Sequence, residues 1–441
     1  MPDIAGWFRD RAVRKVAKHG LPVAIGKGLA SLSGMVTLAV MTRHLGVTVF
    51  GVYAVFRSIA TIVDTYTSFN TWQAIVRYGA QAVADGRPDE VRRIIKFAFT
   101  FDATTAVLGG AIVVVVAFAV PGWDAEKSVL CALYGLTLVT KVAGTSDGIY
   151  RFCDAYRVQA IIGVLGAVVT TIAAVVSVAL DASFAGCVVA LVFAEALSNL
   201  ALTIGSFVVA RRAGYGGWLR VPVAGVRRAH PGILRFLLAT NAQLTVRTSQ
   251  NELDIPVIAA VLGDGPTGLF RVVKQIGTIP GKVFMPFELV VFTELARAAA
   301  ARDYRGFRRL LTRTVALFGG GAFLVWIAIA IGASYVVRLI AGADFIAAAE
   351  PLRWYLLAMV LQMALAPILR AMIALGRPGT LFVFDSISLV VVIGGVVAGA
   401  LLYGLVGVAL AIVLHKIVQL AWSTAWVLRH LHHLERAQMA I

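Results

Sequence analysis

The chain has 441 residues, of which 59% are hydrophobic and 14% are charged, and its mean hydropathy is +0.85. Soluble domains average about 45–50% apolar and about 25% charged residues, so this composition excludes an ordinary soluble enzyme. A bilayer crossing takes about 20 apolar residues, which leaves room for about a dozen crossings. The net charge of +17 would favour nucleic-acid binding in a soluble chain. In a membrane protein, the positions of the basic residues along the chain decide what this charge means.

Apolar runs separated by short polar or Gly/Pro connectors predict about 12 transmembrane helices. Residues 1–20 mix aromatic and basic side chains and predict a cytoplasmic helix lying on the membrane surface. The sequence therefore predicts an all-α polytopic membrane protein. In chain order, the predicted spans are 21–41, 51–71, 94–120, 128–150, 158–180, 185–210, 233–261, 268–293, 314–334, 351–375, 381–402 and 405–428.

The basic residues of the connectors are strongly asymmetric. If the amino terminus is cytoplasmic, 27 of them fall on the inner side and three, Arg43, Lys127 and Arg338, on the outer side. This is the distribution expected from the positive-inside rule. It accounts for the basic charge without nucleic acid, which we exclude as a partner, and it predicts that both termini are cytoplasmic.

The sequence contains an internal repeat. A shift of 217 residues places Leu45-Gly46 on Leu262-Gly263 and Gly51 on Gly268, and a shift of 216 aligns the next connector. Each half then holds six spans, so the halves share one orientation, as in parallel repeats. We predict six-helix bundles at 21–210 and 232–428, joined by a basic cytoplasmic linker, 211–231, and followed by a cytoplasmic tail, 429–441.

Cationic residues inside the predicted spans mark the candidate site, because charges at mid-membrane are costly and face a lumen, a partner or a substrate. The repeat places Arg57 on Lys274. The eighth span carries polar side chains at spacings of three and four, which predicts one polar helical face. Cations of this kind suit phosphate groups. The candidates for substrate binding are Lys27, Arg57, Arg247, Arg271, Lys274 and Lys282.

Carboxylates are also present in or near the spans, at Asp64, Asp102, Asp147, Glu195, Glu252, Asp254, Glu288 and Asp385. For two deep lysines, Lys141 and Lys416, a structural pairing with Glu195 is an alternative to a functional role. The seventh span is unusually polar, and lipid cannot solvate such a run, so much of it must face water or protein. The three cysteines match no metal or disulfide spacing. His430, His432 and His433 in the tail could bind metal but are interpreted as incidental, and no cofactor is expected.

Short patterns carry a resemblance to a known family. They are Arg43-His44-Leu45-Gly46 with Phe50-Gly51-Val52-Tyr53, Glu252-Leu253-Asp254, Leu262-Gly263 with Gly268-Leu269-Phe270, and Pro286. In their order and twelve-span setting they resemble the Wzx-type polysaccharide or O-antigen flippases of the multidrug/oligosaccharidyl-lipid/polysaccharide (MOP) exporter superfamily. The resemblance implies a V-shaped, MOP/MATE-like pair of bundles that moves a sugar-loaded undecaprenyl pyrophosphate across a bacterial inner membrane.

The resemblance also implies roles for single residues. Lys27, Arg57 and Arg271 or Lys274 look equivalent to the cations that hold the pyrophosphate in related peptidoglycan-precursor flippases, although this chain has Lys in span one where those relatives have Arg. Apart from the resemblance, the positions of Lys27 and Lys282 lead us to expect that they guide entry from the cytoplasmic side. Coupling to sodium or protons would involve Asn241 and Asp385.

Two other functions compete with the flippase. A multidrug or organic-cation antiporter of the same superfamily would favour carboxylates rather than cations in the lumen. A membrane-embedded component of a polysaccharide polymerase complex is the second alternative. An enzyme is disfavoured because the outer connectors are short. Expected partners are the lipid-linked oligosaccharide and, in the cell, a polysaccharide polymerase and glycosyltransferases.

Overall fold

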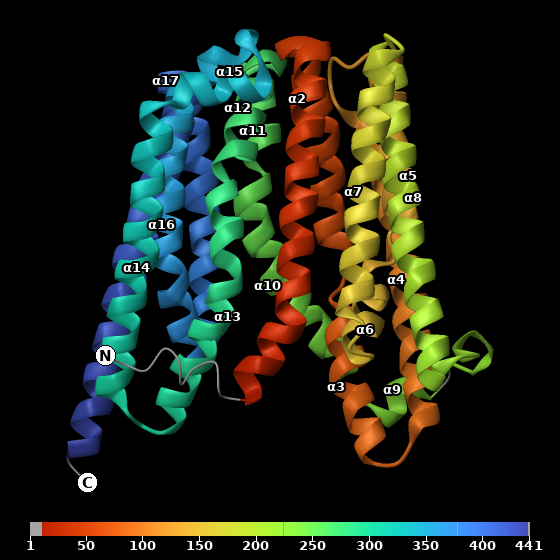
Figure 1. Cartoon of the computed structure of the whole chain (residues 1–441), viewed down its shortest axis with the longest axis vertical. Helices are drawn as coiled ribbons and strands as arrows, with labels where there is room; N and C mark the ends of the chain where they lie inside the picture. The colour runs from red at the N-terminus through yellow and green to blue at the C-terminus, as the bar shows by residue number, and fades with distance from the viewer. Residues whose placement is uncertain (1–10, 224, 377, 440–441) are drawn as a thin grey trace. The chain divides into compact units, whose positions relative to one another are not determined.

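The computed structural model describes residues 11–223, 225–376 and 378–439 (Figure 1). Within these ranges the regular elements are all helices, and no strand occurs. The prediction of an all-α chain is confirmed. Residues 1–10 of the predicted surface helix lie outside the described residues, and residues 11–20 belong to the same long helix as the first predicted span.

The chain divides into two compact units, each of which is made of two separate segments of the sequence. Unit 1 comprises Met1–His44 and Val55–Glu252, and unit 2 comprises Leu45–Ala54 and Leu253–Ile441. Residues 233–252, the first part of the predicted seventh span, therefore group with unit 1. Residues 45–54, at the start of the predicted second span, group with unit 2.

Unit 1 contains most of the first long helix and the helices up to the middle of the predicted seventh span. Its helices are α2 (Arg11–Thr67, except 45–54), α3 (Thr71–Ala84), α4 (Pro88–Ala119), α5 (Ala125–Val139), α6 (Ala143–Phe152), α7 (Tyr156–Ala179), α8 (Phe184–Ala210), η1 (Arg211–Tyr215), η2 (Trp218–Arg220), α9 (Val226–Ala229) and α10 (Ile233–Glu252).

Unit 2 contains the remaining helices. They are α11 (Asp254–Leu262), α12 (Asp264–Gly277), α13 (Ile279–Ala300), α14 (Tyr304–Ile331), α15 (Ala333–Ala341), η3 (Ala343–Ala348), α16 (Ala349–Ala374) and α17 (Pro378–Met439). The 62-residue α17 is bent back at Tyr403 and Gly404, whose backbone is not helical. The ring centroids of Phe384 and Trp422 lie 3.8 Å apart, so its two arms pack against each other.

Eight segments of the described chain are helical, long and apolar enough to cross a membrane. Two of these, Ile25–Ala84 and Gly379–Arg436, have 60 and 58 residues, far more than the roughly 20 that one crossing needs. The predicted seventh and eighth spans are not among the eight. The structure breaks each of them into two helices, α10 with α11 and α12 with α13.

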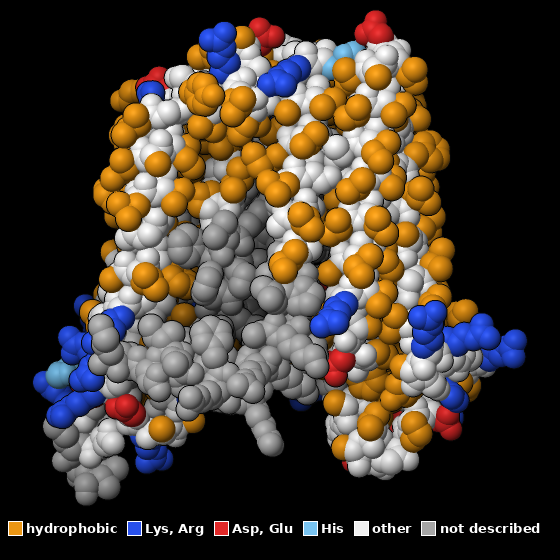
Figure 2. Space-filling view, viewed as in Figure 1, with side chains coloured by type: hydrophobic (Ala, Val, Ile, Leu, Met, Phe, Trp, Pro, Cys, Tyr) orange, Lys and Arg blue, Asp and Glu red, His pale blue; other side chains and the backbone are white. Residues whose placement is uncertain are grey.

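The surface of the spans suits a lipid environment. Large apolar side chains are exposed along α7, among them Ile161, Leu165 and Ile172 at 55–61% of their surface. Hydrophobic side chains cover the face of α7 and α8 seen in Figure 2, while Lys and Arg gather toward the helix ends. Soluble proteins rarely expose apolar patches of this size, so the chain is a multi-pass membrane protein.

The predicted repeat is visible in the backbone. Gly46 and its repeat equivalent Gly263 both leave the helix with positive φ, at φ 70°, ψ 177° and φ 87°, ψ −176°, a region that glycine adopts without strain. The connector from α3 to α4 and that from α13 to α14 also match. Their turns are closed by hydrogen bonds between equivalent residues, Arg87 N to Ala82 O and Asp303 N to Ala298 O.

A second pair of repeat-equivalent glycines lies at a close helix contact within unit 2. A Cβ atom on Gly51 would lie 1.8 Å from the Asp264 carbonyl oxygen, and one on Gly268 would lie 2.2 Å from the Val47 carbonyl oxygen. No side chain fits at either position. The residues 45–54 are therefore held against α12 by backbone contact that only glycine allows.

The connector between the predicted bundles is packed rather than loose. Trp218 is buried among aromatic rings of α4 and α8, with the Phe207 centroid 4.9 Å away. Lys96 Nζ donates hydrogen bonds to the carbonyl oxygens of Leu219 and Val221 at 2.8 and 2.7 Å. Residues 211–221 thus form a fixed cap on unit 1, with the side chains of Arg211, Arg212 and Arg220 exposed.

Candidate functional site

A row of polar side chains follows the second half of α2 in unit 1. Arg57, Thr61 and Asp64 recur at intervals of four and three residues, which places them on one helical face, and Ser68 follows directly after the end of α2 at Thr67. Thr61 Oγ1 donates to the Arg57 carbonyl oxygen at 2.8 Å, and Ser68 Oγ donates to Asp64 Oδ1 at 2.7 Å. Arg57 is half-buried. The predicted cation therefore belongs to a longer polar face.

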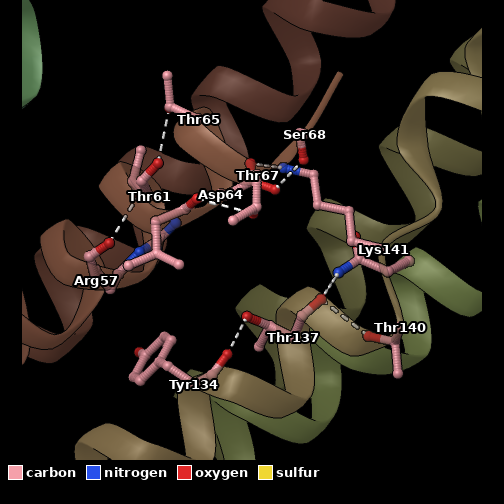
Figure 3. Close-up of polar contacts among 12 residues, drawn as sticks. Arg57, Thr61, Asp64, Thr65, Thr67, Ser68, Tyr134, Thr137, Thr140 and Lys141 are labelled. Carbon is pink, nitrogen blue, oxygen red and sulfur yellow. Dashed lines mark hydrogen bonds and ion pairs between the residues drawn. The ribbon is translucent and has the colours of Figure 1, made fainter. Parts of the chain in front are cut away.

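Asp64 forms an ion pair that the sequence did not predict. Lys141 Nζ lies 2.6 Å from Asp64 Oδ2, and the two side chains are drawn together with Ser68 in Figure 3. Lys141 lies between α5 and α6, where the predicted fourth span is interrupted. The expected pairing of Lys141 with Glu195 is thus corrected. Glu195 acts on Lys141 only through its charge, and the contact is with Asp64.

Asp102 holds three helices of unit 1 together. Its Oδ2 accepts hydrogen bonds from Thr71 Oγ1, Thr145 N and Thr145 Oγ1, at 2.7, 2.6 and 2.6 Å. Asp102 is 6% exposed. A carboxylate with these donors is satisfied where it is, and we assign it a structural role that joins α3, α4 and α6.

Two predicted residues, Asn241 and Arg247, lie on α10, and three contacts join that helix to α2 within unit 1. Ser58 Oγ donates to the Glu252 carbonyl oxygen, Thr245 Oγ1 to that of Thr65, and Tyr66 Oη contacts Ser249 Oγ, at 3.2, 3.4 and 3.1 Å. Arg247 is half-buried and Asn241 is buried. The polar seventh span thus packs on protein over its first part, as its composition predicts.

Lys27 is exposed on the first part of α2. Its charge acts on Asp147 of α6, which also faces Arg151 one turn later, at 3.6 Å, and accepts a hydrogen bond from Gln159 Nε2 at 2.7 Å. Lys27 is thus part of a mixed-charge cluster in unit 1, separate from the contacts that join α2 to α10.

In unit 2 the predicted cation Lys274 is buried and neutralised. Its Nζ lies 2.8 Å from Asp254 Oδ1, and the two side chains are 8% and 7% exposed. Asp254 stands at the first position of α11, and Lys274 in the last turn of α12, so each charge is also favoured by its helix dipole. The sequence listed both residues but did not pair them, because they lie in different spans.

The polar face predicted for the eighth span is interrupted. α12 ends at Gly277 and α13 begins at Ile279, with Pro280 in its first turn. Proline has no amide hydrogen to continue a helical ladder, so it starts a new helix there. Arg271 is half-buried on α12. Lys282 is in α13, but its side chain is outside the part of the chain that the structure describes.

Asp385 belongs to a buried polar cluster between the two arms of α17. Gln419 Nε2 donates to Asp385 Oδ1 at 3.5 Å, and Lys416 Nζ donates to Gln419 Oε1 at 3.3 Å. All three side chains are at most 6% exposed. Lys416 is in unit 2 and Glu195 in unit 1, so their alternative pairing stays a prediction. Asp385 is in unit 2 and Asn241 in unit 1, so their joint role stays a prediction.

The model of one protein family matches this chain. Residues 16–298 match the family described as polysaccharide biosynthesis protein. The chain belongs to this family. The match includes Lys27, Arg57, Arg247, Arg271, Lys274 and Lys282 of the predicted site, as well as the Asp64–Lys141 pair.

A curated relative and solved structures agree with this membership. The chain is 24% identical over 355 residues to the inner membrane protein YghQ of Escherichia coli (strain K12), which covers 78% of this chain and 98% of that protein. An inward-facing multidrug resistance MATE family transporter of the MOP superfamily matches with a TM-score of 0.73 and 15% identity. This match covers 95% of this chain and 99% of that chain. The lipid II flippase MurJ, in an inward closed conformation, matches with a TM-score of 0.71 and 14% identity. This match covers 92% of this chain and 87% of that chain.

These matches confirm the fold class, an all-α polytopic membrane protein of the MOP type. The similar solved structures are transporters and a flippase. Their low identity to this chain leaves the substrate to be argued from its own residues.

Proposed function

We propose that the chain is a flippase that moves an undecaprenyl-pyrophosphate-linked oligosaccharide repeat unit across the bacterial inner membrane by alternating access, for synthesis of a surface polysaccharide. The observation that carries the proposal is a cation at the same repeat position in both halves, Arg57 and Lys274, in a member of the polysaccharide biosynthesis family. The inner-membrane location of YghQ and the lipid substrate of MurJ support the same proposal.

The cations divide into two groups within this proposal. Lys274 is paired with Asp254, and we assign the main phosphate contacts to Arg57 and Arg271 because an arginine side chain binds phosphate bidentately, whereas lysine acts as a point charge. The remaining predicted contacts are Lys27, Arg247, Lys274 and Lys282. Asn241 and Asp385 are the proposed ion-coupling residues, both termini are placed in the cytoplasm, and a polymerase and glycosyltransferases are the expected partners.

The experiment is complementation of a strain that lacks this protein. Wild type should restore surface polymer and clear lipid-linked repeat units that accumulate on the inner leaflet. Arg57→Gln with Arg271→Gln should restore neither, while the matched control Arg93→Gln, at an exposed arginine of α4, should behave as wild type. Normal polymer in the deletion strain, with altered sensitivity to cationic drugs, would instead assign the chain as a multidrug antiporter.

A further inference from the structure

The Asp64–Lys141 pair lies beside two interruptions of helices in unit 1. α2 ends at Thr67 and α3 begins at Thr71, while α5 ends at Val139 and α6 begins at Ala143. Asp64 is in the last turn of α2, and Lys141 is inside the second interruption. Broken helices within a membrane occur where the backbone is covered by protein or lines a water-filled cavity, and transporter binding sites form at such places.

The pair is accessible, unlike the ion pair of unit 2. The side chains of Lys141 and Asp64 are 39% and 20% exposed, against 8% and 7% for Lys274 and Asp254. An accessible ion pair gains little net free energy, because water competes for both charges. A more highly charged anion that reaches Lys141 can therefore displace the Asp64 carboxylate.

The Asp64 carboxylate keeps one hydrogen bond when the Lys141 ammonium moves away. Ser68 Oγ donates to Asp64 Oδ1 at 2.7 Å, and this hydrogen bond remains when the ammonium moves away. The negative charges of Glu195 on α8 and Asp147 on α6 also favour the positive charge of the Lys141 ammonium. The ammonium can therefore exchange one oxygen ligand for another without leaving this region of unit 1.

Arg57 lies on the same face of α2, two turns before Asp64. Seven residues separate them, which is about 10 Å along the helix, and both Arg57 and Lys141 have long side chains. A phosphate group bound by Arg57 is therefore within reach of a Lys141 that has left Asp64. Other charged groups on neighbouring elements of unit 1 include Arg247 and Glu252 on α10 and the satisfied Asp102 on α4.

We propose that Lys141 is a further ligand for the pyrophosphate of the substrate, held by Asp64 in the empty protein and transferred to a phosphate oxygen when the substrate binds. This inference rests on the proposed function, since it takes a lipid-linked pyrophosphate as the substrate. Asp64 is then a competitor of the substrate for one ammonium, and it prevents an uncompensated positive charge when no substrate is present.

The test is binding of inorganic pyrophosphate to the purified full-length chain, measured by calorimetry at fixed ionic strength. Lys141→Met should weaken binding about 10-fold or more, the range expected for a lost hydrogen bond to a charged group. Asp64→Asn should strengthen binding several-fold, because it removes the competing carboxylate. In Asp64→Asn with Lys141→Met, a neutral pair of similar size, that gain should disappear, since both changes act through one ammonium.

The outcomes separate this inference from the proposed function. If Arg57→Gln abolishes binding but the Asp64→Asn variants bind equally with and without Lys141, the role of Lys141 is wrong and the flippase proposal stands. If wild type binds no pyrophosphate, both are wrong. The control Arg93→Gln removes one exposed positive charge from the same unit and should bind as wild type, which excludes a general effect of net charge.

Discussion

The same repeat position carries a cation in each half, but the two cations have different surroundings. In unit 1, Arg57 is half-buried, and seven residues further along the chain the Asp64 carboxylate is paired with Lys141. In unit 2, Lys274 is buried and paired with Asp254. Sequence duplication thus preserved the charge, whereas packing decides how deeply each of the two cations is buried.

The largest expected effect is loss of the buried pair in unit 2. Lys274→Met removes the ammonium from a buried carboxylate, which we expect to cost about 3–5 kcal/mol of stability, measured as thermal unfolding of the purified protein. Lys274→Met with Asp254→Asn should recover most of it, because a neutral pair needs no counter-charge. Equal instability of the single and double variants would show that the pair does not carry the effect.

Substitution of either glycine at the close helix contact, Gly51 or Gly268, should lower the stability of the protein by a similar amount. Gly51→Ala and Gly268→Ala each place a Cβ against a backbone carbonyl and should destabilise by about 1–3 kcal/mol, the range for overpacking. Gly163→Ala is the matched control, because a Cβ there meets nothing within 4 Å. Thermal stability distinguishes them. A response at only one of Gly51 and Gly268 would contradict the equivalence of the two positions.

Arg57 should behave in the opposite way to Lys274. Because it is half-buried, Arg57→Gln should leave thermal stability nearly unchanged and lower transport about 10-fold to 100-fold, as expected for a lost charged hydrogen bond. Transport of lipid-linked substrate into proteoliposomes measures the effect. A large loss of stability together with unchanged transport in the folded fraction would assign Arg57 to the fold.

The smallest expected effect concerns the packed connector of unit 1. Lys96→Met removes hydrogen bonds to two connector carbonyls and should cost about 1–2 kcal/mol. Hydrogen exchange should rise in residues 211–221 and stay unchanged in unit 2. Uniform exchange across both units would indicate that the connector is not held locally.

Much of the fold follows from local sequence. The 3.6-residue and apolar patterns predict helices, and the Leu-Gly repeat predicts equivalent bends at Gly46 and Gly263, which the backbone confirms. The interruptions within spans two and four were not predicted. Hydropathy averages over a window of residues, so it does not detect a break at Lys141.

The site was only partly predictable for a related reason. Sequence spacing identifies which residues share a helical face, as with Arg57 and Asp64, and the repeat identifies equivalent depths. It does not identify contacts between spans that are far apart in the chain, such as Lys141 with Asp64, 77 residues away. The expected partner Glu195 was plausible by composition alone, and tertiary packing selected Asp64.

The sequence by itself determined that the chain crosses the membrane many times, that its halves are repeats, and that cations recur within them, because these properties reside in local composition and periodicity. Only the tertiary structure decided which cations are neutralised. The strength of an ion pair depends on which groups packing brings within a few ångströms and on how far water reaches them. The buried Asp254–Lys274 pair and the accessible Asp64–Lys141 pair therefore give two lysines different physical roles.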